Sequence, residues 1–282
     1  QEQLSANTVQ KWAGTFMDTL KRPSQSILYP TRALSTSVRQ MMVDNYRHAQ
    51  KRQIFLDYDG TLSPFLDDPA RARPSQKLHD MVRKLAEAPG NELVVVSGRN
   101  KHDLEEWLGD IKLTLVAEHE SLVRTPQGKW SKKHHAVLGW KKSVKQMMEI
   151  YASRTPGAFV EEKESSLVWD YRKSPPYHAQ KNMVILKRLL TKTLRGTELK
   201  VYSGNKILEV KPKTANKGVT VSELLHDGTD FVLSIGDDYT DEDIFASLPA
   251  YAFSVKVGPG RTHARYRLKS VEEVLTLLKK LT

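Results

Sequence analysis

Residues 53–61 read QIFLDYDGT, a short apolar run that ends on two aspartates separated by one residue. A run of this length beside turn residues is typical of a strand buried on both faces. Two further runs have the same form: residues 93–99 (LVVVSGR) end on a serine, and residues 231–238 (FVLSIGDD) end on two more aspartates. Strands of this kind form parallel sheets covered by helices, and ligands bind at the carboxyl ends of such strands.

Helical patterns separate these strands along the chain. The alternation predicts an α/β fold of the Rossmann type, with a parallel sheet and helices on both of its faces. A third short strand is expected at residues 113–117. The predicted helices of this rhythm are residues 75–88, 101–108, 217–225, 241–247 and 271–281.

The alternation of strands and helices is interrupted between residues 126 and 211. There the pattern predicts a helix at 131–153, strands within 159–171, a helix at 176–194 and a hairpin at 199–210 that turns at Ser203 and Gly204. We therefore expect three parts: a helical lead-in at 1–50, a catalytic core at 51–125 and 212–282, and an inserted α+β cap domain at 126–211. The lead-in has little core of its own, so we expect it to pack on something else.

Charge is distributed unevenly over the 282 residues, which carry a formal net charge of +11. The inserted segment holds 18 basic and 7 acidic residues, and the remaining residues carry equal numbers of each. This charge indicates either a solvated lysine-rich surface or a field for an anionic substrate. A nucleic-acid groove is less favoured, because aromatic residues do not interleave the lysines.

Composition also narrows the cellular setting. No apolar run approaches the ~18 residues that a membrane span needs, and the first 30 residues do not form a signal peptide. The chain has no cysteine, which excludes disulfides, thiolate nucleophiles and cysteine-bound zinc. We expect a cytoplasmic protein without a membrane or nucleic-acid partner.

The polar residues at the three strand ends indicate one shared site. Each taken alone fits a turn or a helix cap, but turn chemistry does not explain all three together. Aspartates that converge repel one another, and a divalent cation is the usual remedy; oxygen ligands favour Mg²⁺. Beside this metal Asp57 is suited to attack a phosphate ester, and Asp59 to exchange protons with the leaving alcohol and with water. Ser97 and one lysine would complete the cradle for the phosphoryl group.

Four motifs together resemble those of the haloacid dehalogenase superfamily of phosphatases. They are DYDGTL at residues 57–62, SGR at 97–99, NKG at 216–218 and GDDYTDED at 236–243. Within that superfamily, residues 55–268 are most similar to trehalose-6-phosphate phosphatases, in particular to the C-terminal phosphatase domain of fungal trehalose-synthesis enzymes. Residues 8–22 resemble the end of the glycosyltransferase half that precedes this domain. One departure is Glu120, where the family usually has glycine.

The resemblance assigns roles to particular residues. It implies Asp57 as nucleophile, Asp59 as acid and base, and a Mg²⁺ site formed by Asp57, the backbone of Asp59, Asp237 and Asp241. Phosphate would be held by Thr61, Ser97 and Lys217. The sugar would be bound by Glu118, Glu161, Lys163, Arg172, Lys206 and Glu209.

Strand alternation bears on the sugar-binding residues. It independently puts Glu161 and Lys163 on one face of a strand. By the same rule Lys206 and Glu209 would face opposite sides of a regular strand, so either a bulge or a different assignment of one residue is needed.

The sequence thus favours Mg²⁺-dependent hydrolysis of trehalose 6-phosphate through an aspartyl-phosphate intermediate. One alternative is the same chemistry on another sugar phosphate, because the catalytic motifs do not encode the sugar. Another is a non-catalytic regulatory subunit of a trehalose-synthesis complex, although such a subunit has no chemical reason to keep both Asp57 and Asp59. An upstream glycosyltransferase domain or a trehalose-synthesis complex is the expected partner.

Overall fold

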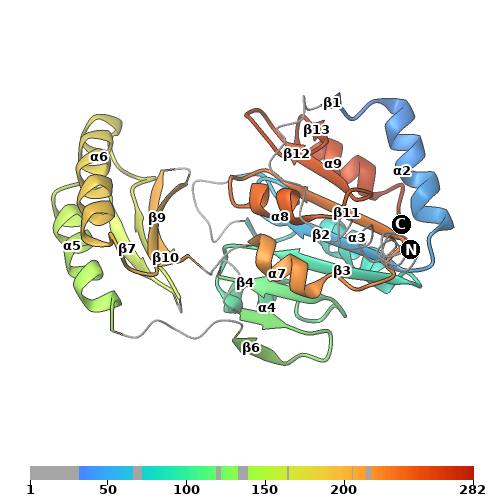
Figure 1. The fold of residues 1–282 in the computed structure, drawn as a ribbon, viewed down its shortest axis with the longest axis horizontal. Helices are drawn as coiled ribbons and strands as arrows, with labels where there is room; N and C mark the ends of the chain where they lie inside the picture. The colour runs from blue at the N-terminus through green and yellow to red at the C-terminus, as the bar shows by residue number, and fades with distance from the viewer. Residues whose placement is uncertain are drawn as a thin grey trace, which may run out of the picture.

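Within the residues that the structure describes, nine strands form the larger of two β-sheets, in the order β1-β13-β12-β11-β2-β3-β4-β5-β6 (Figure 1). This computed structural model describes residues 32–65, 72–118, 122–132, 139–163, 165–204, 206–213 and 217–282. Neighbouring strands run parallel from β1 to β4, and β5 and β6 extend the sheet antiparallel. The strands are β1 (Arg32–Ala33), β2 (Arg52–Asp57), β3 (Asn91–Val96), β4 (Thr114–Ala117), β5 (Leu122–Arg124), β6 (Trp130–Lys132), β11 (Phe231–Gly236), β12 (Phe253–Val257) and β13 (Tyr266–Leu268).

Helices cover both faces of this sheet, as the sequence pattern predicts. Ile54 and Leu56 of β2 share one apolar core with α2, α3, α4 and α9, whereas Phe55 packs on the other face with α7 and α8. Successive strand residues point to opposite faces, so an uninterrupted apolar run supplies both cores. The predicted parallel α/β architecture is confirmed. The helices are α2 (Thr36–His48), α3 (Gln76–Glu87), α4 (Lys101–Leu108), α7 (Lys217–Leu224), α8 (Asp241–Ser247) and α9 (Val271–Leu278).

The segment between β6 and α7 folds into a separate unit, which we call the cap. Its sheet is antiparallel in the order β7-β8-β10-β9, and α5 and α6 cover the face turned away from the larger sheet (Figure 1). Trp169, Val144 and Leu186 lie in an apolar core that belongs to the cap alone. The elements are α5 (Lys141–Ser153), β7 (Phe159–Glu162), β8 (Leu167–Asp170), α6 (Pro176–Thr193), β9 (Leu199–Gly204) and β10 (Ile207–Pro212).

The sequence pattern was wrong at two places in this segment. The helix predicted from residue 131 begins at Lys141, and Trp130–Lys132 is instead strand β6, paired with β5 in the larger sheet. A three-residue strand is too short for its periodicity to show. The hairpin does not turn at Ser203 and Gly204, because both residues still belong to β9 and Gly204 pairs with Ile207 of β10.

The second half of the predicted lead-in packs on the core. Arg32 and Ala33 of β1 pair with β13 at the edge of the sheet. Helix α2 begins at the side-chain cap of Ser35 and buries Met42 and Tyr46 in the same core as β2. The helical spacing at residues 9–20 lies outside the described residues, as does Glu120.

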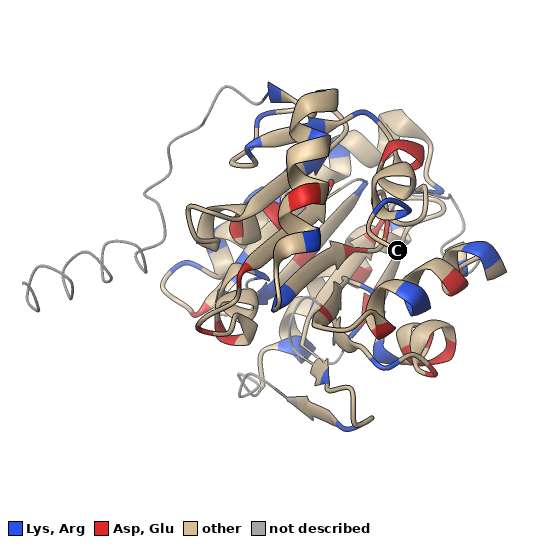
Figure 2. Ribbon diagram, turned by 90° about the vertical axis from the view of Figure 1, so that its right-hand side faces the viewer, with Lys and Arg blue, Asp and Glu red and all other residues tan. Residues whose placement is uncertain are grey.

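Charged residues are placed differently on the core and on the cap. Figure 2 views the core from the end opposite the cap, where basic and acidic residues are intermixed over the helices and loops. Helix α6 of the cap, in contrast, has four basic residues and no acidic one. Across the described ranges, every helix is too short or too polar to cross a lipid bilayer.

Candidate active site

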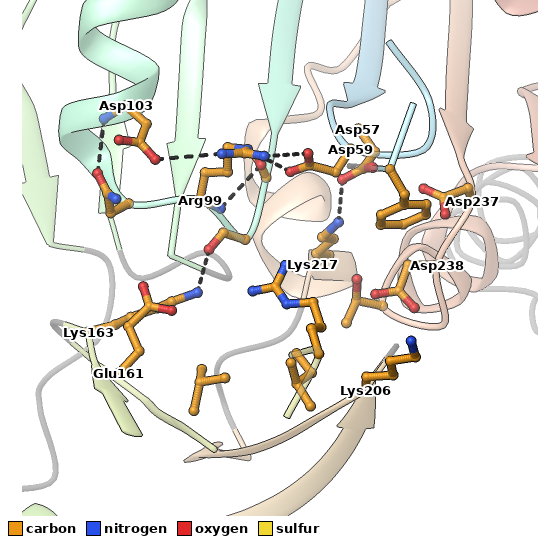
Figure 3. A pocket seen from close by; sticks show the side chains of 18 residues that line it. Asp57, Asp59, Arg99, Asp103, Glu161, Lys163, Lys206, Lys217, Asp237 and Asp238 are labelled. Carbon is orange, nitrogen blue, oxygen red and sulfur yellow. Dashed lines mark hydrogen bonds and ion pairs between the residues drawn. The ribbon is translucent and has the colours of Figure 1, made fainter. Parts of the chain in front are cut away.

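A cavity of about 500 Å³ lies between the carboxyl edge of the larger sheet and the cap (Figure 3). The adjacent strands β3, β2 and β11 bring Ser97, Asp57 and Asp237 to this edge. The predicted convergence of the three strand ends is therefore present in the fold. The lining residues are Asp57, Asp59, Phe65, Ser97, Gly98, Arg99, Asn100, Asp103, Lys217, Asp237, Asp238 and Thr240 from the core, and Glu161, Lys163, Val168, Arg172, Lys206 and Ile207 from the cap.

Three carboxylates meet at the floor of this cavity. One oxygen each from Asp57, Asp237 and Asp241 lies within 4.8 Å of the others. The Lys217 ammonium, only 2% exposed, donates to Asp57 Oδ1 at 2.9 Å and to Asp241 Oδ1 at 2.8 Å. Asp241 is fully buried and reaches the cluster from the first turn of α8. The predicted lysine thus lies directly beside the predicted nucleophile.

The electrostatics of the cluster are suited to a divalent cation. Burial, reinforced by the charges of Asp241 and Asp237 and opposed by Lys217, raises the pKa of Asp57 well above its ordinary value. Burial and the neighbouring carboxylates Asp241 and Asp238 raise the pKa of Asp237 to about 7. Three carboxylates and one ammonium leave two formal negative charges. An all-oxygen donor set with this charge fits Mg²⁺.

Two glycines make room for the acidic side chains. Gly60 has a φ of +80°, and a Cβ built on it would lie 2.4 Å from Asp237 Oδ2. A Cβ on Gly236 would lie 2.3 Å from Asp241 Cγ. Both distances are far inside van der Waals contact, so any side chain at either position would displace a carboxylate. Gly60 and Gly236 therefore leave the space that the Asp237 and Asp241 side chains occupy.

Arg99 holds Asp59 in a bidentate ion pair. Its Nε and Nη2 donate to the two carboxylate oxygens of Asp59, each at 2.7 Å. The guanidinium also lies over the ring of Trp107, 4.6 Å from its centroid, and its side chain is 9% exposed. Paired, planar contacts of this kind fix the orientation of a carboxylate. In the sequence Arg99 belongs to the SGR motif, and its position two residues beyond the strand-terminal Ser97 is the signal that places it near the site.

The other two predicted phosphate ligands lie in different surroundings. Ser97 follows β3, lines the cavity, and accepts a hydrogen bond on Oγ from the Arg99 backbone N–H at 3.2 Å. Thr61 is fully buried, and its hydroxyl donates to Asp237 Oδ1 at 3.4 Å. Thr61 is not among the lining residues, so in this arrangement its side chain faces the acidic cluster.

Four of the six predicted sugar-binding residues line the cavity, namely Glu161, Lys163, Arg172 and Lys206 from the cap. Figure 3 shows Glu161 and Lys163 on the cap side of the space, opposite Asp59 and Arg99. Lys163 Nζ crosses to the core and donates to the backbone carbonyl of Gly98 at 2.9 Å.

The remaining two residues lie apart from the cavity. Glu209 is 1% exposed on β10 and pairs in register with Tyr202. Glu118 follows β4 with a φ of +52°, and its N–H donates to the carbonyl of Arg99 at 2.9 Å. The question about Lys206 and Glu209 is resolved by the turn, because Lys206 has a φ of +55° and precedes the strand. The alternation rule therefore does not apply to this pair.

The fold is shared with solved protein structures. A haloacid dehalogenase-like hydrolase from Bacteroides thetaiotaomicron shares the fold with a TM-score of 0.61 at 15% identity, over 82% of this chain and 100% of that chain. The C-terminal domain of C. albicans trehalose-6-phosphate phosphatase is more similar, with a TM-score of 0.84 at 32% identity, over 89% of this chain and 97% of that chain.

Sequence comparison identifies the family. A family model described as trehalose-phosphatase matches residues 55–272. The chain is 35% identical to the bifunctional trehalose-6-phosphate synthase/phosphatase of Thermoproteus tenax, over 100% of this chain and 39% of that protein. It is 33% identical to the trehalose-phosphatase of Saccharomyces cerevisiae, over 86% of this chain and 30% of that protein. The chain therefore belongs to the trehalose-phosphatase family, and it spans between 30% and 39% of the length of these curated relatives.

Proposed function

We propose that the chain hydrolyses trehalose 6-phosphate to trehalose and phosphate in a Mg²⁺-dependent reaction, as part of trehalose biosynthesis. The observation that carries this proposal is the position of Asp57, which lies in direct contact with Lys217 and beside the Asp237 and Asp241 carboxylates, at a cavity that the cap also lines. A phosphoryl group that enters there meets an attacking carboxylate and positive charge at one point.

Asp57 is the proposed nucleophile. Its carboxylate oxygen forms a bond to phosphorus while the bond from phosphorus to the sugar oxygen breaks, which leaves an aspartyl phosphate. Asp57, Asp237, Asp241 and the backbone of Asp59 would hold Mg²⁺, which offsets the repulsion between carboxylate and phosphate when it is bound. Lys217 and Ser97 orient the phosphoryl oxygens, while Thr61 supports the site through Asp237.

Asp59 is the proposed acid and base. It gives a proton to the leaving sugar oxygen, and then takes a proton from the water that attacks phosphorus and releases Asp57. The bidentate contact with Arg99 fixes the orientation of this carboxylate at the cavity.

The cap is the proposed site of sugar selection. Glu161, Lys163 and Arg172 present charged groups from the cap to the cavity, where a disaccharide offers many hydroxyls. Lys163 also joins cap to core through Gly98, so its contacts depend on how far the cap closes. Glu118 and Glu209 are not lining residues: Glu209 would support this surface from β10 of the cap, and Glu118 would act on the core side through its backbone contact with Arg99.

A phosphate-release screen tests the proposal. Trehalose 6-phosphate, sucrose 6-phosphate and glucose 6-phosphate are compared at equal concentration with Mg²⁺, using Asp57→Asn as the inactive control. We expect trehalose 6-phosphate to have the highest kcat/KM. A higher value for another sugar phosphate would favour the alternative substrate, and no release from any of them would favour a regulatory role.

We also propose a trehalose-6-phosphate synthase as the partner, either in the same polypeptide or in a complex. Support comes from the T. tenax relative, which is named as a bifunctional synthase/phosphatase. A relative from Dictyostelium discoideum, 37% identical over 98% of this chain and 36% of that protein, is named as a trehalose-phosphate synthase. Co-purification of synthase activity with the native protein tests this partner.

A further inference from the structure

Lys256 is the fourth of the five residues of β12, directly beside the strand that carries the acidic loop. Strand β12 pairs with β11, and Lys256 is in register with Gly236, the residue before Asp237. Lys256 is 5% exposed and is not among the residues that line the cavity. A buried lysine is costly unless its ammonium is fully paired, so its partners indicate its function.

Lys256 has two hydrogen-bond partners and one ion-pair partner. The ammonium donates to the backbone carbonyl of Asp237, and lies 3.3 Å from the carbonyl of Asp238. Its third neighbour is Glu242 Oε1, at 3.5 Å. Two of these contacts are to main-chain oxygens of consecutive residues, so Lys256 constrains the path of the loop itself.

Glu242 is fixed in turn by the loop that follows β12. Its Oε2 accepts a hydrogen bond from the Thr262 hydroxyl at 3.0 Å and from the backbone N–H of His263 at 2.6 Å. Lys256 and Glu242 therefore connect the acidic loop to a second segment that lies outside the cavity. The loop that presents Asp237 to Asp57 is therefore restrained by two residues that do not line the cavity.

Two buried lysines thus have different contacts at this site. Lys217 touches the carboxylates of Asp57 and Asp241, whereas Lys256 touches the backbone behind Asp237 and Asp238. The ammonium of Lys256 also reduces the repulsion among carboxylates that are gathered within six residues of chain.

We propose that Lys256 is a positioning residue for the metal site: it holds the 237–238 backbone so that the Asp237 carboxylate keeps its place beside Asp57. This role rests on the Mg²⁺ site of the proposed function. It acts through the loop and without contact to the substrate. Groups that orient metal ligands typically contribute ~10–100-fold to metal affinity or activity.

The test is a calorimetric titration of the 282-residue chain with Mg²⁺ alone, for the parent and for Lys256→Met. Methionine approximates the length of the lysine stem without its donors. We expect the Kd for Mg²⁺ to rise by about tenfold or more. Lys280→Met, at an exposed position on the surface, makes the same change in net charge and should leave the Kd unchanged.

A second variant separates positioning from stability. Lys256→Arg keeps the charge, but its planar donors cannot reproduce three diverging contacts, so it should also weaken Mg²⁺ binding while far-UV circular dichroism stays that of the parent. If Lys256→Met fails to fold, Lys256→Arg decides the question. A Kd within twofold of the parent in the folded variant overturns the role of Lys256. Absence of Mg²⁺ binding by the parent overturns the metal site itself, and this role with it.

Discussion

Replacing Gly60 with alanine adds one methyl group beside Asp237, and the geometry fixes what that group meets. The new Cβ would lie 2.4 Å from Asp237 Cγ and Oδ2, whereas ordinary contact begins at 3.4 Å. Asp237 would therefore have to retreat by about 1 Å. Asp237 is one of the three clustered carboxylates, so this movement would displace one ligand of the proposed metal site.

Two costs follow from this substitution, and they appear in different measurements. Alanine at a positive φ is strained by about 1–2 kcal/mol, which lowers the free energy of unfolding. Misplacement of a catalytic group by ~1 Å reduces turnover by about 10²-fold, so we expect kcat/KM for trehalose 6-phosphate to fall by that factor. Mg²⁺ should also bind more weakly.

Gly228→Ala provides the matched control for backbone strain. Gly228 has a φ of +75°, and a Cβ built there meets nothing within 4 Å. It should lose a similar free energy of unfolding in urea while keeping the kcat/KM of the parent. If Gly60→Ala also kept kcat/KM within threefold of the parent, the argument that Gly60 makes room for a functional carboxylate would be wrong.

Three further predictions concern groups around the same cavity. Arg99→Lys loses the paired contact with Asp59 and should lower kcat about tenfold or more for trehalose 6-phosphate and p-nitrophenyl phosphate alike; unchanged steady-state kcat would contradict it. Glu161→Ala should reduce kcat/KM about tenfold for trehalose 6-phosphate only, the scale of one charged hydrogen bond; equal loss with p-nitrophenyl phosphate would exclude a role in sugar recognition. Exhaustive EDTA treatment should abolish phosphate release and Mg²⁺ should restore it, whereas full activity in EDTA would contradict a metal site.

Sequence was most informative where one residue both ends a strand and carries the chemistry. The apolar runs before Asp57, Ser97 and Asp237 locate three strands, and parallel pairing then brings their ends together without further information. The break in the βα alternation and the excess charge predicted a cap at residues 126–211, but β6 (Trp130–Lys132), inside that range, pairs with β5 in the larger sheet.

Contacts made by the backbone could not be read in this way. Lys256 lies in a strand, β12, that the sequence pattern did not predict. Two of its partners are backbone carbonyl oxygens, which every residue has, so the sequence cannot indicate these contacts. The strands β1 and β13 have two and three residues, too few to show alternation. The position of Lys206 depended on the hairpin, which does not turn at Ser203 and Gly204 as the sequence indicated.

The central claim is that Asp57 becomes phosphorylated during turnover, and the Asp59→Asn variant tests it most directly. With p-nitrophenyl phosphate the leaving group needs no proton, so the first step should proceed while the second, which needs the base, is slowed. Rapid mixing with Mg²⁺ should release one equivalent of nitrophenol per chain in a burst. Mass spectrometry of the quenched protein should then find one phosphoryl group on Asp57, and the Asp57→Asn/Asp59→Asn double variant should show neither signal. Steady hydrolysis by Asp59→Asn without a burst, and with Asp57 unmodified, would contradict the covalent mechanism.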